Sequence, residues 1–114
     1  MSQYTPDRWM IVKIDHKDTV HYRVFACWYG GYAGSDSWKL NSGITSVVLE
    51  DDCYHFTGSS GSVYICHKDC YGANMYGHSV LTHLIEEGKP VGTIIEPLPE
   101  TVNPLELPYE TDHS

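Results

Sequence analysis

The chain has 114 residues, of which 41% are hydrophobic and 19% are charged, and its formal net charge is −8. This length and composition are typical of one globular domain that buries enough surface to fold without disulfides or a structural metal. No apolar run approaches the roughly 20 residues that span a bilayer, so we expect no membrane-spanning segment.

The first two strands are predicted from apolar alternation near the N-terminus. Residues 9–15 alternate so that one face is fully apolar, which predicts a strand. The polar run 16–19 then predicts a turn. Residues 22–29 carry apolar side chains on both faces, and this pattern favours a second strand in a central position of the sheet.

A glycine-rich loop and a meander are predicted next. Residues 30–37 contain three glycines without periodicity and predict a loop, and residues 38–40 predict a short strand. Three further strands are predicted at 44–50, 53–57 and 63–67, joined by tight turns at Asp51–Asp52 and at 58–62. Short turns between consecutive strands predict an antiparallel arrangement.

One helix and a last strand complete the predicted domain. Residues 73–87 place apolar side chains at helical spacing, Gly88 supplies a stop, and Pro90 keeps the helix from resuming. Residues 91–95 predict a strand. The order of elements predicts an α+β domain over residues 1–96, in which one helix packs across an antiparallel sheet of about five to seven strands.

The C-terminal end carries most of the acidic charge. Residues 96–114 contribute −5 of the net −8 and contain no Lys or Arg, so residues 1–95 carry −3. Direct nucleic-acid binding requires clustered Lys and Arg and is therefore disfavoured. Four prolines interrupt residues 97–114, which predicts an acidic, extended and mobile tail.

Cysteine usage and the first residues bear on the compartment. Residues 1–20 contain six charged side chains, so we expect no secretory leader and a soluble protein in a reducing cytoplasm. Four cysteines are present, and in such a compartment we expect them to be free thiols: Cys27, Cys53, Cys66 and Cys70.

The sequence contains candidates for a metal site and for a nucleophile. Two thiols followed by two imidazoles resemble a structural zinc set, with Cys53 and His55 as substitutes: Cys66, Cys70, His78 and His83. Only seven residues separate the two pairs, against about twelve in a two-Cys, two-His finger, so we expect no metal and no cofactor.

Cys70 is the candidate nucleophile because it precedes the predicted helix, whose N-terminus favours a thiolate. His67, Asp69 and His78 are near in sequence and are candidates to orient or deprotonate the thiol. The carboxylate of Asp69 would instead raise the thiol pKa. We therefore expect a protein that is not an enzyme.

The best candidate for binding is the aromatic loop. Trp and Tyr combine a large apolar face with a hydrogen-bond donor, and glycines allow close approach of a partner. The candidate binding residues gather in and beside this loop: Trp28, Tyr29, Tyr32, Asp36, Trp38 and Asn41. The alternative is that Trp28 and Trp38 cap the core while the tyrosines cover its rim.

The loop also carries a likeness to known proteins. The runs 28–32 and 36–44, with the later residues 61–64 and 67–68, resemble small accessory proteins of tailed bacteriophages over about residues 9–88. This resemblance implies no catalytic residue. It implies a bacterial cytoplasm as the working site and a host protein or a virion component as the partner.

Three functions follow from these expectations. The first is a non-enzymatic binding module that modulates or inhibits a host protein through the aromatic loop. The second is a small-ligand binder or enzyme, with a pocket lined by residues of the loop and by His67: Trp28, Asp36, Trp38 and His67. The third is a virion structural component, for which self-association would be the first sign. The oligomeric state is left open.

Overall fold

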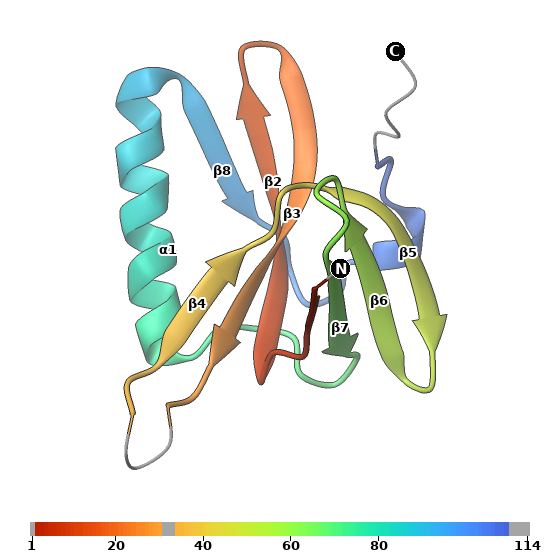
Figure 1. The fold of residues 1–114 in the computed structure, drawn as a ribbon. Helices are drawn as coiled ribbons and strands as arrows, with labels where there is room; N and C mark the ends of the chain where they lie inside the picture. The colour runs from red at the N-terminus through yellow and green to blue at the C-terminus, as the bar shows by residue number, and fades with distance from the viewer. Residues whose placement is uncertain (1, 31–33, 110–114) are drawn as a thin grey trace.

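The computed structural model describes residues 2–30 and 34–109. Its strands form two four-stranded sheets, with one α-helix beside them (Figure 1). Sheet A has the order β1 (Gln3–Tyr4), β7 (Val63–His67), β6 (Cys53–Gly58) and β5 (Ile44–Glu50). Sheet B has the order β4 (Ser37–Leu40), β3 (Thr19–Trp28), β2 (Arg8–His16) and β8 (Thr93–Pro97). The predicted α+β class is confirmed, but the strands are divided between two sheets.

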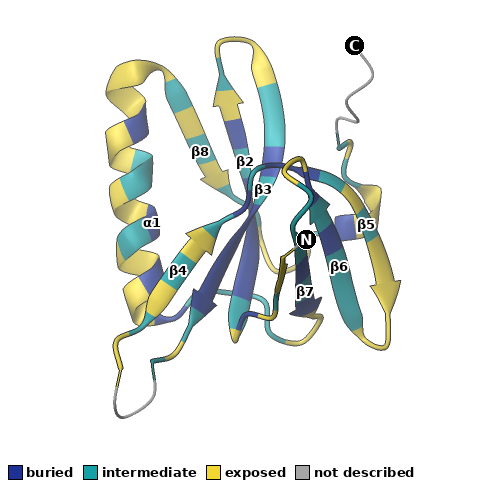
Figure 2. Ribbon diagram, viewed as in Figure 1, coloured by how far each residue is buried: buried dark blue, intermediate teal, exposed yellow. Residues whose placement is uncertain are grey.

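The central strands of sheet B separate two cores. Successive side chains of a strand point to opposite faces, so β2 sends Trp9 and Ile11 to one side and Met10 and Val12 to the other. The first core lies between the sheets: Trp9, Ile11, Tyr22, Val24, Ala26, Ile44, Phe56, Tyr64 and Cys66. The second lies between sheet B and the helix: Met10, Val12, Ile14, Phe25, Cys27 and Leu81. Burial is therefore concentrated on β2 and β3, as Figure 2 shows.

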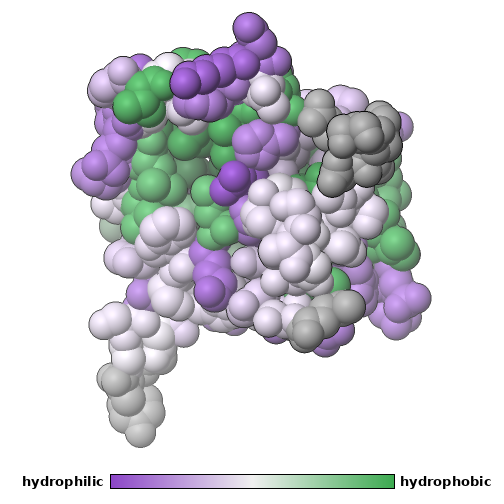
Figure 3. Space-filling view, turned by 45° about the horizontal axis from the view of Figure 1, so that its top comes forward, coloured by the Kyte–Doolittle hydropathy of each residue, from purple (hydrophilic) through white to green (hydrophobic). Residues whose placement is uncertain are grey.

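The helix α1 (Met75–Gly88) covers the outer face of sheet B. Its N-cap is Asn74, whose side-chain oxygen accepts a hydrogen bond from the backbone N–H of Gly77. On the face shown in Figure 3, apolar side chains gather on the side of the molecule where α1 lies against sheet B. Within the residues described, no helix combines the length and the apolar character needed to cross a membrane.

The end of the helix differs from the prediction. Gly88 is the last residue of α1, and the chain continues through a 3-10 helix (Lys89–Val91) that contains Pro90. The left-handed conformation of Gly92, with φ 79°, then ends the helical segment. Gly88 serves close packing instead, because a Cβ atom there would lie 2.7 Å from the carbonyl oxygen of Thr93.

The predicted meander is confirmed. β5, β6 and β7 pair antiparallel in sequence order, and Asp51 and Asp52 both have positive φ at the β5–β6 turn. This is the backbone that a two-residue hairpin turn requires, and Asp tolerates it better than most residues. The sequence analysis missed β1, which is two residues long and pairs parallel with β7.

The segment after β8 packs on the domain. The N–H of Leu98 donates to the carbonyl of Ile11 at 2.9 Å, and Pro104 is buried in a short 3-10 helix (Pro104–Glu106). The ring of Tyr109 meets that of Tyr22 edge to face at 5.9 Å. The prediction of an extended tail is therefore not confirmed for residues 98–109, because their apolar side chains cover the first core. Residues 110–114 lie outside the described part.

Tyr71 ties this C-terminal segment to sheet B. Its hydroxyl accepts a hydrogen bond from the N–H of Ile11 at 3.1 Å and donates one to the carbonyl of Leu98 at 2.8 Å. Burial raises the pKa of Tyr71 to about 12. The folded chain thus holds the phenolic proton more tightly than the unfolded chain, whose tyrosines ionise near pH 10. The stabilisation is complete below about pH 10 and is lost as the pH rises towards about 12.

We expect Tyr71→Phe to lower the free energy of unfolding near pH 7 by about 1–3 kcal/mol, because the Ile11 N–H loses its acceptor. The variant should also lose less stability than the parent between about pH 10 and about pH 12. Urea denaturation across this range measures both effects. Tyr76→Phe, at an exposed position of α1, is the matched control. An equal alkaline loss in Tyr71→Phe and the parent would contradict the assignment.

Candidate functional site

The two tryptophans of the aromatic loop lie on opposite faces of sheet B. Trp38 is opposite Cys27 in the β3–β4 ladder, and its ring stacks on Phe25 at 5.7 Å in the second core. Trp28 points to the other face, where its ring meets that of Tyr4 edge to face at 6.4 Å. Both indoles are half-buried. Their rings therefore pack against different cores.

Three further predicted residues have distinct surroundings. Asn41 is only 2% exposed, and it exchanges hydrogen bonds with the backbone of Val24 through its own N–H and its side-chain oxygen. It holds the chain after β4 against β3 and is not available on the surface. Tyr29 is 56% exposed. Tyr32 lies outside the described residues.

Asp36 joins the β3–β4 hairpin to the start of α1. One carboxylate oxygen accepts a hydrogen bond from the N–H of Gly30 at 3.0 Å. The other accepts one from the side-chain amide of Asn74 at 3.4 Å, and Asn74 in turn caps the helix. The N–H of Tyr29 donates to Asp7 at 2.8 Å, so the hairpin is also anchored on its other side. These bonds fix the two segments relative to each other.

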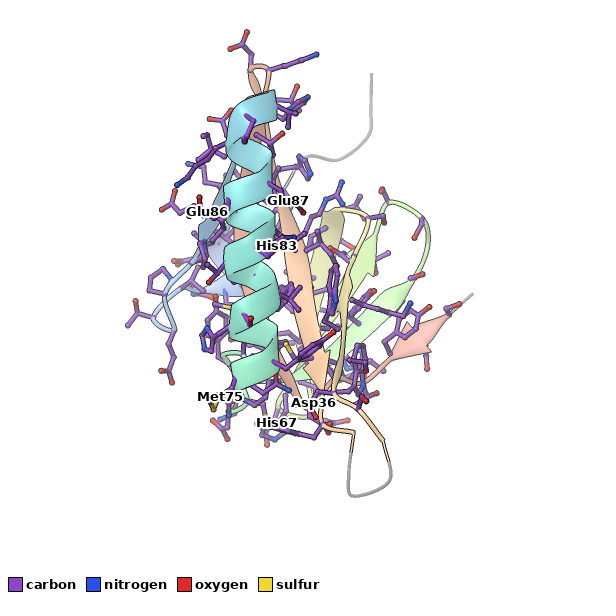
Figure 4. The ribbon with its side chains drawn as sticks, turned by 90° about the vertical axis from the view of Figure 1, so that its left-hand side faces the viewer. Asp36, His67, Met75, His83, Glu86 and Glu87 are labelled. Carbon is purple, nitrogen blue, oxygen red and sulfur yellow. The ribbon has the colours of Figure 1, made fainter. Side chains whose placement is uncertain are left out.

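Large apolar side chains are exposed where these segments meet. Figure 4 shows Asp36 and Met75 at the N-terminal end of α1, where Asp36 bonds to Asn74. Met75 is 90% exposed and Tyr76 is 43% exposed, and both directly follow Asn74 in the chain. Tyr29 is the residue before Gly30, which bonds to Asp36. We call this area the hairpin–helix surface and define it by four residues: Tyr29, Asp36, Met75 and Tyr76.

The sequence analysis missed Met75 and Tyr76. They lie outside the apolar stripe by which the helix is recognised, and large apolar side chains outside such a stripe were the available signal. No sequence spacing indicated that they lie beside residues of the hairpin. That proximity depends on the contact between Asp36 and Asn74, which are 38 residues apart.

An aromatic pocket lies on the opposite side of the β3–β4 ladder from α1. Its volume is about 410 Å³, and seven residues line it: Gln3, Tyr4, Thr5, Trp28, Ser37, Trp38 and Lys39. The ammonium of Lys39 lies over the ring of Tyr4, 5.1 Å from its centroid, and the indole N–H of Trp28 donates to the carbonyl of Thr5. Both predicted tryptophans line this pocket, whereas Asp36 and His67 do not.

The candidate zinc ligands do not come together. Among the described residues, no group of three or more His, Cys, Asp or Glu side chains is placed to hold a metal ion. Cys66 is fully buried in the first core, and burial raises the pKa of its thiol well above the ordinary range. His78 and His83 are exposed on α1, where His83 pairs with Glu87 at 3.2 Å.

Cys70 does not adjoin the helix as predicted. The chain passes through four more residues before α1 begins, and the N-cap is Asn74. Cys70 is half-buried against the first core, and its backbone bonds to His67 and Trp9. The imidazole of His67 accepts a hydrogen bond from the N–H of Asp69 at 3.1 Å. The helix N-terminus is thus not positioned to stabilise a thiolate at Cys70.

Comparisons with protein-family models, with curated proteins and with solved structures found no match to this chain. The likeness to small phage accessory proteins therefore stays a prediction. What the described residues offer is a rigid, partly apolar surface at one end of α1 and an aromatic pocket beside the same hairpin.

Proposed function

We propose that this chain is a small non-enzymatic binding module that contacts a partner protein through the hairpin–helix surface. If the phage likeness holds, the partner is a bacterial host protein in the cytoplasm, whose activity the module modulates. The observation that carries the proposal is the exposure of Tyr29, Met75 and Tyr76 at one end of the molecule. Exposed aromatic and methionine side chains that gather in one place are typical of protein interfaces.

The chemistry of these side chains suits a protein partner. Tyrosine supplies contact area with few rotatable bonds, and methionine adapts its shape to an irregular surface. The hydrogen bonds of Asp36 and Asn74 hold the backbone in place before binding, which reduces the entropy lost in the complex. Asp7 and Asp36 add carboxylates beside the apolar groups. A partner with an apolar centre and basic side chains near it would be complementary.

Site-specific photo-crosslinking tests this proposal. A photoreactive residue at position 75 of the full chain should crosslink one protein from bacterial lysate, and excess unlabelled chain should compete with it. Replacing Tyr29 and Tyr76 with serine should weaken the interaction about tenfold or more, because interface aromatics contribute much of the binding energy. A photoreactive residue at Val48, which is 58% exposed on β5, is the matched control.

Each outcome separates the candidate functions. A competed partner at position 75, absent at position 48, supports the binding module. The same bands at both positions, or none at either, would contradict it. A crosslink only to a second copy of the chain would instead favour the virion structural component.

The aromatic pocket supports a second candidate function, a small-ligand binder. Its tryptophan and tyrosine faces, the Lys39 ammonium and the hydroxyl of Ser37 offer an apolar surface with a few polar groups, as ligand sites do. A thermal-shift screen against sugars and nucleotides distinguishes this function. A shift that Trp28→Ala removes would favour the pocket over the hairpin–helix surface.

A further inference from the structure

A second pocket lies away from both candidate sites. It forms where β3 meets the connection between β4 and β5 and the turn between β6 and β7, segments that lie side by side near the centre of Figure 1. Its volume is about 290 Å³, and eight residues line it: Thr19, His21, Arg23, Ser42, Gly43, Ile44, Thr45 and Ser59. None of the described lining residues is acidic, although the whole chain carries a net charge of −8.

Among the lining residues that the structure describes, Arg23 is the only lysine or arginine. Its Nε–H donates to Nε2 of His21 at 3.0 Å, which orients the guanidinium. Across residues 2–30 and 34–109, no carboxylate lies within ion-pair distance of it, and its other side-chain N–H groups have no protein acceptor. Partial burial lowers the pKa of Arg23, yet a guanidinium stays charged at neutral pH. A half-buried cation without a counter-ion favours the entry of an anion.

Hydrogen bonds between two loops fix the wall of the pocket beside this cation. The N–H of Ser59 donates to the carbonyl of Gly43 at 2.9 Å, and the N–H of Ser60 donates to the hydroxyl of Ser42 at 3.0 Å. Gly43 has φ 131°, a conformation that residues with side chains rarely adopt. The chain after β4 and the β6–β7 turn are thereby held together. Hydroxyls at positions 42, 45 and 59 line the pocket beside the guanidinium.

We propose that this pocket binds a phosphoryl group, either inorganic phosphate or a phosphate monoester. A guanidinium matches two oxygens of a phosphate at once. The hydroxyls of Ser42, Thr45 and Ser59 donate to protein oxygens in this structure, and on binding they would rotate towards the other phosphate oxygens without adding charge. The pocket has room for a phosphate and part of the molecule that bears it. The site is independent of the hairpin–helix surface.

Calorimetry and NMR with the full chain test the proposal. Sodium phosphate should bind with measurable heat, whereas sodium chloride at equal ionic strength should not. Arg23→Gln should weaken phosphate binding about tenfold or more, because the bidentate charged contact is lost. Lys68→Gln removes one exposed positive charge outside the pocket and should leave binding unchanged. Phosphate should also shift the amide resonances of Gly43 and Ser59 in the unmodified chain.

The controls distinguish specific binding from the general effect of phosphate on stability, since phosphate stabilises many proteins by exclusion from their surface. Equal phosphate binding in Arg23→Gln and the parent, or unshifted resonances at Gly43 and Ser59, would overturn the proposal. The amide resonances of Gly43 and Ser59 in the unmodified chain test phosphate binding even if Arg23→Gln does not fold. O-phosphoserine and glucose 6-phosphate, titrated in parallel, identify whether a phosphorylated side chain or a small metabolite-like ester fits best.

Discussion

Gly77→Ala is expected to lower the free energy of unfolding by about 1–3 kcal/mol, although alanine is the better helix former by about 1 kcal/mol. Gly77 is buried where α1 crosses sheet B, and a Cβ atom there would overlap Sγ of Cys27 and lie 2.9 Å from Oδ1 of Asn74. Cys27 is fully buried on β3 and has no room to move. The helix would have to shift away from sheet B. Leu81 on the helix would then lose packing against Phe25 and the other residues of the second core.

Urea denaturation of three variants isolates this contact. Ser79→Ala, at an exposed position of the same helix, should stabilise the chain by a few tenths of a kcal/mol, as helix propensity predicts. Cys27→Ala with Gly77→Ala should be less destabilised than the sum of the single variants, because the removed sulfur leaves space for the added methyl group. If Gly77→Ala is as stable as the parent, or if the two substitutions are additive, the contact does not set the position of α1.

Much of the fold could be predicted from sequence because its strands alternate and its turns are short. The range 9–15 was correctly predicted as a strand, and the acidic pair Asp51–Asp52 correctly marked a hairpin. What alternation could not indicate is that β2 faces a different core on each side. A strand with one fully apolar face and a partly apolar second face fits one sheet covered by a helix, but it also fits the middle layer of three.

The C-terminal segment illustrates why composition misled the prediction. Proline and acidic residues lower the chance of regular structure, and residues 98–109 indeed form no strand. Its apolar residues nevertheless have a place to pack, since Leu98 bonds to β2 and Tyr109 covers Tyr22. Such long-range packing has no periodic signal in the segment itself. The packing of this segment depends on where the first core is left uncovered in the folded domain.

The candidate site was predictable only in part for the same reason. The glycine-rich hairpin and its exposed Tyr29 were identified from local composition. Trp28 and Trp38 were grouped with it because they are close in sequence, yet strand alternation and pairing put their rings on opposite faces of sheet B. Met75 joins the surface through the contact between Asp36 and Asn74, and a single sequence carries no record of that contact.

The largest effect is expected from Trp9→Ala, which should lower the free energy of unfolding by about 3–5 kcal/mol. Trp9 is 1% exposed, and its ring lies 5.4 Å from that of Phe56 and 4.9 Å from that of Tyr71, measured between centroids. Its indole N–H also donates to the carbonyl of His67 at 2.7 Å, which ties β2 to the end of β7. A small domain is stable by only about 5–15 kcal/mol, so this loss would remove a large share of the stability of the chain.

Two companion variants keep this prediction testable. Trp9→Phe retains an aromatic ring but leaves the carbonyl of His67 without its donor, and it should cost about 1–3 kcal/mol by urea denaturation. Trp28→Ala should be less destabilising than Trp9→Ala, because Trp28 is only half-buried at the rim of the first core. If Trp28→Ala were the more destabilising, the tryptophan of the aromatic loop would be the main support of the core. In that case Trp28 would serve mainly to support the core, and ligand binding in the aromatic pocket would be a lesser role of this side chain.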